Sequence, residues 1–574
     1  MKLFSLCASV LLAGCATAQP MPNVTQLADQ YVLEYSRADP LEARLWGLET
    51  APDTLIGDNT IAARNDWLAR ERAWRSEIDH VEPDALSGAE RAIYANLRGK
   101  IDSDIALEAC HRELWPLSHV SGWQLNLVDS LNTAVEASHG AQSSALARGW
   151  ASQIVAYIDT EQANLGEGLR AGYSTPRSVA VQVAAQLDAL ASPDGDLLAA
   201  ADEMSPDAAN AWRSAFADAL APRLTQYAAF IRDEYAPRAR TDRSLAALPN
   251  GGACYAASIE QHTGMTMSPA EIAALSARLR AYAEAQLSAA GQALWGVADP
   301  DEIRARLRAS PGDMLTSEQD VAENAAADAE RLIAASAPYF PAIPASGTLR
   351  VELYPPEQRA GMVASYHPAP DQTGVYSVNP ESERVRDRRS LESITSHEIA
   401  PGHHFQALFG RHETDEAHPI LTLGLNNAFV EGWAQYAEMF AIEEHMLSYR
   451  ETAISYWSGY GGAAAIEAAF HSAQANEETT ARAVLRRRNL PEDDLSLADP
   501  ALDWMAVMPG QIVSYDLGAD FIRRLRDHAR ATLGERFDYP TFHRLILEEG
   551  SVPLARLDEK IEAWIGAETS VRRP

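Results

Sequence analysis

The segment from residue 396 to residue 406 constrains this chain most, because it places three imidazoles and a carboxylate among apolar residues. These four groups belong to His397, Glu398, His403 and His404. Neutral imidazoles are common zinc ligands, and a carboxylate beside a ligand can take the proton from an attacking water. The pattern therefore predicts a metal centre of the kind that hydrolases use.

Pro401 stands where the helical H-E-x-x-H motif carries its second histidine. Proline lacks an amide donor and clashes with the preceding turn, so we expect the helix to kink or bulge there. Such a bend brings His403 to the position of the second ligand beside His397. A smaller bend favours His404, which lies seven residues after His397 and faces the same way. Otherwise His404 is expected to contact substrate.

A second apolar segment, residues 427–438, contains two acids seven residues apart. Glu431 and Glu438 therefore lie on nearly one helical face. Carboxylates in so apolar a segment are costly unless they are paired or bound to a metal. We expect Glu431 to be the third ligand and Glu438 to orient a metal-bound histidine.

The composition indicates a folded protein with a large core: of 574 residues, 47% are apolar and 22% are charged. The formal net charge of −32 argues against a nucleic-acid partner. The sequence leaves the oligomeric state open.

The first 18 residues read as an export signal, with Lys2 followed by an apolar run. Residues 12–15 resemble a bacterial lipobox, which predicts Cys15 as the lipidated first residue of a periplasmic, outer-membrane lipoprotein. Membrane contact is then expected only through this anchor. Ordinary cleavage after Ala18 is the alternative and gives a soluble exported protein. In the exported chain, Cys110 and Cys254 either form a disulfide or stay separate buried thiols.

The rest of the chain predicts a mainly α fold, a large multi-helix scaffold in a single domain over residues 20–574. Its N-terminal helical part runs to about residue 340, and the metal-binding part begins at about 341. Helix starts are marked at residues 205–207, 268–271 and 316–319. Strand alternation is confined mainly to residues 348–379 and predicts a small sheet near the active site. Its edge either pairs with an extended peptide or is purely structural.

Residues 509–518 open a further helix, with Gln511 and Tyr515 on one side. A tyrosine there can donate a hydrogen bond to a developing oxyanion. A core tyrosine is the plain alternative.

Three blocks together resemble the domain of unknown function family 885, whose members are large helical bacterial proteins, many of them lipoproteins. The blocks are His397-Glu398-x-x-Pro401-Gly402-His403-His404, Glu431-Gly432-Trp433-Ala434-x-Tyr436-Ala437-Glu438 and Pro509-Gly510-Gln511-x-x-x-Tyr515-x-x-Gly518. The family is similar to helical zinc peptidases of the gluzincin class, such as thermostable carboxypeptidases and angiotensin-converting enzyme. In those enzymes a glycine precedes the second zinc histidine, which favours His403.

The family often has an arginine-rich helix ending in Asp-x-x-x-His, and the nearest match here, Glu467 to His471, lacks the arginines. An anionic substrate group then needs another partner, such as Arg482 or one of residues 486–488.

The resemblance implies an exported peptidase with one Zn²⁺ that acts on short peptides, as a carboxypeptidase or dipeptidase. Glu398 is the expected base and Tyr515 the oxyanion donor. Supporting or substrate-binding roles are expected for His404, Glu438, Gln511, Tyr366 and His471. The rivals are a zinc hydrolase acting on another ester or amide bond, and a non-catalytic envelope lipoprotein with a structural metal.

Overall fold

The computed structural model describes residues 23–138, 143–310, 312–342, 349–359, 362–368, 374–412, 418–423 and 426–570. The expected signal segment, with Cys15, lies outside these residues. The described chain is mainly helical with one small sheet, which confirms the predicted fold class.

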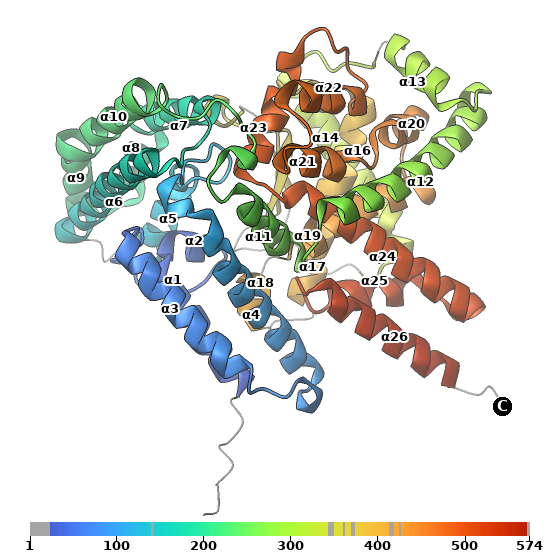
Figure 1. Cartoon of the computed structure of the whole chain (residues 1–574), viewed down its shortest axis with the longest axis horizontal. Helices are drawn as coiled ribbons and strands as arrows, with labels where there is room; N and C mark the ends of the chain where they lie inside the picture. The colour runs from blue at the N-terminus through green and yellow to red at the C-terminus, as the bar shows by residue number, and fades with distance from the viewer. Residues whose placement is uncertain are drawn as a thin grey trace, which may run out of the picture.

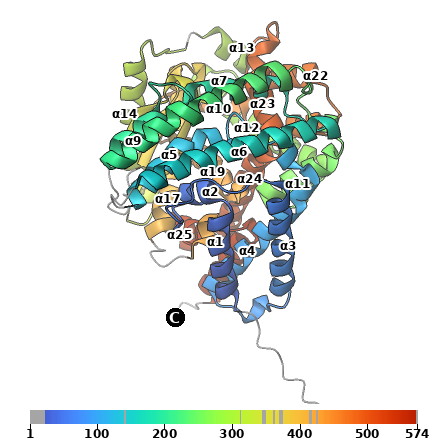
Figure 2. The same cartoon turned by 90° about the vertical axis from the view of Figure 1, so that its left-hand side faces the viewer.

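The helices of the N-terminal half lie on the left of Figure 1. They are α1 (Val24–Ala38), α2 (Pro40–Leu45), α3 (Ile61–Ile78), α4 (Gly88–Ala106), α5 (Trp123–Ala137), α6 (Ser144–Ala171), α7 (Arg177–Leu190), α8 (Asp196–Ala199), α9 (Pro206–Ala215) and α10 (Ala221–Phe230). Figure 2 looks onto the layer that α6, α7, α9 and α10 form over the rest of the molecule. This layer has its own apolar core, which contains Trp150, Trp212 and Tyr227, all fully buried.

The remaining helices carry the larger core and the expected metal ligands. They are α11 (Gly251–Thr263), α12 (Pro269–Trp295), α13 (Pro300–Ala309), α14 (Glu318–Ser336), α15 (Glu383–Arg386), α16 (Arg388–Glu398), α17 (His403–His412), α18 (Ile420–Leu423), α19 (Asn427–Glu443), α20 (Arg450–Gly459), α21 (Ala463–His471), α22 (Glu477–Arg487), α23 (Asp499–Val507), α24 (Gln511–Leu533), α25 (Tyr539–Leu547) and α26 (Leu554–Ser570). Their core continues to the first helix: Val24 and Tyr31 of α1 are in the same buried cluster as Leu557 of α26.

The predicted helix starts are confirmed. Ser268 caps α12 and forms a capping box with Glu271. Ser317 does the same for α14 with Asp320, and α9 begins at Pro206. Capping boxes at α12 and α14, and the N1 proline of α9, therefore mark where these helices begin.

The sheet contains β1 (Leu349–Leu353), β2 (Ala364–Pro368) and β3 (Gly374–Val378) in the order β1-β3-β2. β1 runs parallel to β3, with Val351 opposite Tyr376. β2 runs antiparallel to β3, with Tyr366 opposite Tyr376. The alternation of intermediate and exposed residues in β1 follows the predicted pattern, and the sheet lies against α16 and α17.

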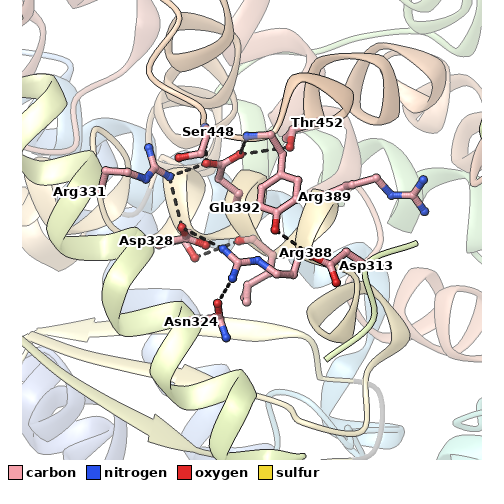
Figure 3. Close-up of polar contacts among 12 residues, drawn as sticks. Asp313, Asn324, Asp328, Arg331, Arg388, Arg389, Glu392, Ser448 and Thr452 are labelled. Atoms are coloured by element: carbon pink, nitrogen blue, oxygen red, sulfur yellow. Dashed lines mark hydrogen bonds and ion pairs between the residues drawn. The ribbon is translucent and has the colours of Figure 1, made fainter. Parts of the chain in front are cut away.

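A buried polar network fixes α16 between α14 and α20 (Figure 3). Glu392 is fully buried and accepts hydrogen bonds from Tyr449 N–H and from the Thr452 hydroxyl, both at 3.1 Å. It thereby caps the N-terminus of α20, and it also pairs with Arg331 of α14. Because Glu392 is on α16, this network anchors the helix that ends at the expected metal site.

Helices α19 and α24 cross at backbone contact. A Cβ on Gly518 would lie 1.7 Å from the carbonyl oxygen of Ala428, and a Cβ on Gly432 would lie 2.4 Å from Gly518 Cα. Only glycines allow this approach. The crossing brings Glu431 of one helix beside Gln511 and Tyr515 of the other.

Cys110 and Cys254 form a disulfide in the structure. Of the two alternatives that the sequence left open, the structure has the bridge.

Candidate metal centre

The chain breaks at Pro401 more sharply than the expected kink. Helix α16 ends at Glu398, a new helix begins at His403, and the peptide bond before Pro401 is cis. The Trp433 indole N–H of α19 lies 3.0 Å from the Pro401 carbonyl oxygen and 3.2 Å from that of Gly402. A Cβ at Gly402 would lie 1.7 Å from the His397 carbonyl oxygen, so the break requires glycine there. The prediction of one bent helix is wrong in this respect, because proline and glycine together end the helix.

The break brings together the three predicted ligands. Ligand atoms of His397, His403 and Glu431 all lie within 4.8 Å of one another. The two Nε2 atoms lie 3.6 Å and 3.4 Å from Glu431 Oε2. Within the described residues, no other group of three or more histidines, cysteines and acids has ligand atoms close enough together to hold a metal ion.

Each ligand histidine is oriented through its other ring nitrogen. His397 Nδ1 donates to Glu438 Oε1 at 2.9 Å, the role expected for Glu438. The Ser393 hydroxyl donates to the second Glu438 oxygen at 2.6 Å. His403 Nδ1 lies 3.3 Å from Gln406 Oε1. With Nδ1 protonated, Nε2 of both rings presents a lone pair to the space beside Glu431.

The donor set fits a cation. Glu431 Oε2 is buried and has no hydrogen-bond partner in the described residues, yet it faces the two Nε2 atoms. A positive charge among these three atoms stabilises their close approach, and a bound cation can supply that charge. Two imidazole nitrogens and one carboxylate are a donor set typical of catalytic zinc.

Charged neighbours shift the pKa values of the residues at this site. Burial acts to lower the pKa of His397, but Glu431 and Glu438 outweigh it and raise the pKa well above its ordinary value. Burial acts to raise the pKa of Glu431, but His397 and His403 lower it far below the usual range. Glu398 lies in the same field: burial raises its pKa, while the two histidines act to lower it. A carboxyl with a raised pKa beside two ligands is suited to accept a proton.

Helix α24 supplies two more of the predicted residues. The Tyr515 ring stacks on that of His397, with centroids 6.1 Å apart and planes at 16°. Burial, followed by the nearby Glu431, raises the pKa of Tyr515 well above its ordinary value, so the phenol stays protonated. Gln511 Nε2 lies 3.4 Å from Glu431 Oε1, and the Trp504 indole donates to Gln511 Oε1 at 2.7 Å.

His404 is directed away from the ligand cluster. Its Nδ1 lies 3.1 Å from the Tyr366 hydroxyl on β2, and its ring is almost fully buried. Burial lowers the pKa of His404 to about 4, so the ring is neutral at pH 7. The structure therefore brings His403, not His404, to the candidate metal site and joins His404 to the sheet.

His471 does not join this group. One of its ring nitrogens accepts from Leu245 N–H at 3.1 Å, and the other lies 3.1 Å from the Met505 carbonyl oxygen. Burial lowers its pKa to about 3. Because backbone groups occupy both nitrogens, His471 packs loops together and has no nitrogen left for a substrate. The family motif from which it was carried over lacks its arginines here.

Sequence reasoning did not assign four further residues. Ser393 supports Glu438, Gln406 supports His403, Trp433 holds the break, and Trp504 orients Gln511. For two of them the sequence spacing could have indicated contact with a ligand, because Ser393 lies one helical turn before His397 and Gln406 lies one turn after His403.

Comparison with known proteins assigns the chain to a family. A family model described as bacterial protein of unknown function (DUF885) matches residues 40–561. The chain belongs to the DUF885 family. The match extends over most of the chain and includes all three blocks that suggested the resemblance.

Two solved structures share the DUF885 fold seen here. A putative lipoprotein from Colwellia psychrerythraea has a TM-score of 0.79 at 17% identity, and the alignment covers 96% of this chain and 100% of that one. A putative lipoprotein of unknown function from Shewanella oneidensis has a TM-score of 0.69 at 16% identity, with 94% and 99% covered. A search of curated proteins found no match. None of the described helices combines the length and apolar character needed to cross a membrane.

Proposed function

We propose that this DUF885 protein is an exported zinc-dependent peptidase that hydrolyses short peptides. The observation that carries the proposal is the convergence of His397 Nε2, His403 Nε2 and Glu431 Oε2 beside the buried Glu398. A structural zinc site generally has four protein ligands, whereas three leave a position open for chemistry. The donor set of two imidazoles and one carboxylate favours zinc as the ion.

Zinc bound here supplies Lewis acidity, which lowers the pKa of a water and polarises a carbonyl. The residues of the chain supply the rest. Glu398 takes the proton of the attacking water and returns it to the departing amine. The protonated Tyr515 phenol donates a hydrogen bond to the developing oxyanion. Glu438 and Gln406 hold the two ligand rings in the required tautomer.

The preference for short peptides rests on access and on the sheet. The side chains of His397, His403 and Glu431 are 14%, 15% and 15% exposed, which suits a narrow approach rather than contact with a folded protein. Strand β2 pairs with β3 on one side only within the described residues, and its Tyr366 contacts His404 beside the site. A strand at the edge of a sheet can bind an extended peptide through backbone hydrogen bonds.

The proposed location is the periplasm, with a lipid anchor at Cys15. The lipobox-like residues 12–15 and the Cys110–Cys254 bridge both suit an exported protein. The two structurally similar proteins are themselves described as putative lipoproteins.

The test compares the zinc-loaded protein with its Glu398→Gln variant on a library of short peptides. We expect the variant to keep its zinc and to lose turnover by about 100- to 10,000-fold, because only the base is removed. Glu352→Gln, an exposed carboxylate on β1, is the control and is expected to cleave as the native protein does. Absence of peptide cleavage by the native zinc form, or undiminished cleavage by Glu398→Gln, would contradict the proposal. Cleavage of esters alone would assign the site to another bond.

A further inference from the structure

A second candidate binding site lies in the upper right part of Figure 1, where α12, α13, α20, α21 and α22 meet. It is a cleft of about 660 Å³, within the range of volumes that hold small-molecule ligands. Its lining includes five arginines and none of the metal-site residues. The arginines are Arg280, Arg304, Arg308, Arg486 and Arg487.

This concentration of positive charge is unusual for a chain with a net charge of −32. Two acids also line the cleft, but the Asp301 side chain is 95% exposed and is largely screened by water. The other, Glu492, pairs with Arg486 at 3.4 Å. Arg280 and Arg304 share the Glu284 carboxylate, and Arg304 also pairs with Asp301 at 3.3 Å. The arginines therefore outnumber the charges available to neutralise them.

Arg487 is a partly buried arginine of the cleft that lacks an ion-paired carboxylate among the described residues. No hydrogen bond or ion pair joins its side chain to any part of the chain that the structure describes, and its Nε is buried. Burial lowers its pKa; Asp516 acts against this shift, and Arg384 and Arg280 add to it. Asp516 itself receives a hydrogen bond from Gln435 at 3.2 Å and lies beyond ion-pair distance of Arg487. A guanidinium in such surroundings is stabilised by an anion that reaches it.

A glycine turn forms part of the cleft lining. Gly461 and Gly462 line the cleft just before α21 begins. This turn packs closely on α12, because a Cβ on Gly461 would lie 3.0 Å from Leu279 Cβ. Arg280 fixes this turn, because its guanidinium donates to the Tyr460 carbonyl oxygen at 3.1 Å. Arg280 is thus held in place by this turn, and the other four arginines line the same volume.

We propose that this arginine cleft binds a small organic anion that carries at least two carboxylate or phosphate groups. Guanidinium groups match the planar, two-oxygen geometry of carboxylate and phosphate, and several around one volume favour a ligand with more than one such group. The cleft is separate from the candidate metal centre and does not depend on the proposed peptidase activity.

The experiment is calorimetric titration of the native protein with succinate and, separately, with fructose 1,6-bisphosphate. The two arms distinguish a dicarboxylate from a bisphosphate ligand. We expect at least one of them to bind with an affinity in the micromolar to millimolar range that falls as salt is added. Arg487→Gln is expected to weaken that binding about 10-fold or more. The rim variant Arg308→Gln should weaken it less, and it tests the site if Arg487→Gln does not fold.

Two controls separate this site from others. Arg213→Gln removes a surface arginine of α9 that pairs with Asp202, and it should leave the affinity unchanged. His403→Ala disrupts the candidate metal centre and should also leave it unchanged. The proposal is overturned if neither anion binds the native protein at millimolar concentration. It is equally overturned if both arginine-cleft variants bind as the native protein does, or if His403→Ala abolishes binding.

Discussion

The Glu438 carboxylate accepts a hydrogen bond from His397 Nδ1 at 2.9 Å, and its other oxygen accepts one from the Ser393 hydroxyl. Glu438 is on α19, and both of its partners are on α16. One carboxylate thus fixes the tautomer of a ligand and ties together the two helices that supply His397 and Glu431.

Replacing Glu438 with Ala is expected to lower zinc affinity by about 10- to 100-fold, because the His397 ring loses the group that orients it. Competition with a chromogenic chelator measures this affinity. Glu444→Ala removes another carboxylate of α19's C-terminal end, one bonded to Tyr339 and Tyr539, and should leave zinc affinity as it is. Equal affinities for the native protein and Glu438→Ala would contradict this role.

Tyr515→Phe is expected to keep its zinc and to lower kcat by about 100-fold, because the ring can still stack on His397 while the oxyanion loses its donor. Steady-state kinetics with a cleaved peptide, together with zinc analysis, separates the two effects. Tyr94→Phe, which removes a hydroxyl that accepts from Arg98 on α4, serves as the control. An unchanged kcat in Tyr515→Phe would show that Tyr515 is a core tyrosine and not an oxyanion donor.

How far the sequence could predict this site depended on the range of the interactions. The ligand identities followed from residue type within two short segments, and the glycine before His403, which the resembled enzymes share, favoured His403 over His404. The sharp break at Pro401 was underestimated, since the pattern does not show that Trp433 holds the two carbonyls of the break.

Contacts between segments far apart in the chain could not be predicted from the sequence. The capping of α20 by Glu392 joins residues about sixty positions apart, and no sequence pattern near either residue predicts this contact. The parallel pairing of β1 with β3 was equally invisible, because alternation predicts strands but not their partners. His471 shows the opposite error: a motif match suggested a substrate contact, while the fold gave both its nitrogens to backbone groups.

Gly402→Ala is expected to destabilise the protein by several kcal/mol or to displace His403, because the new Cβ would lie 1.7 Å from the His397 carbonyl oxygen. Urea unfolding and zinc binding measure the two outcomes. The matched control is Gly99→Ala in α4, where a Cβ meets no atom within 4 Å. That change should raise stability by about 0.5–1 kcal/mol, as expected in a helix. A native-like Gly402→Ala would show that the break tolerates a side chain.

Glu467 should make stability fall as pH rises. It is fully buried, and burial raises its pKa to about 8 from 4.5, although the Gly510 N–H acts to lower it. Between these two values the folded state holds a proton that the unfolded state has released. The free energy of unfolding therefore decreases with pH, by up to about 1.4 kcal/mol per unit for this group.

Glu467→Gln removes that titration, so its stability should depend less steeply on pH between about 5 and 8. Urea unfolding of the metal-free proteins across this range provides the comparison. Glu478→Gln on the exposed face of α22 is the control. Parallel curves for the native protein and Glu467→Gln would contradict the raised pKa.

The most direct test of the metal centre is the zinc content of the purified protein and of two neighbouring variants, measured by plasma mass spectrometry after dialysis. His403 Nε2 faces Glu431 Oε2 at 3.4 Å, whereas His404 Nδ1 lies beside the Tyr366 hydroxyl. We predict one zinc per chain for the native protein and for His404→Ala, and almost none for His403→Ala. A native protein that takes up no metal, or a His403→Ala variant that keeps it while His404→Ala loses it, would contradict the account.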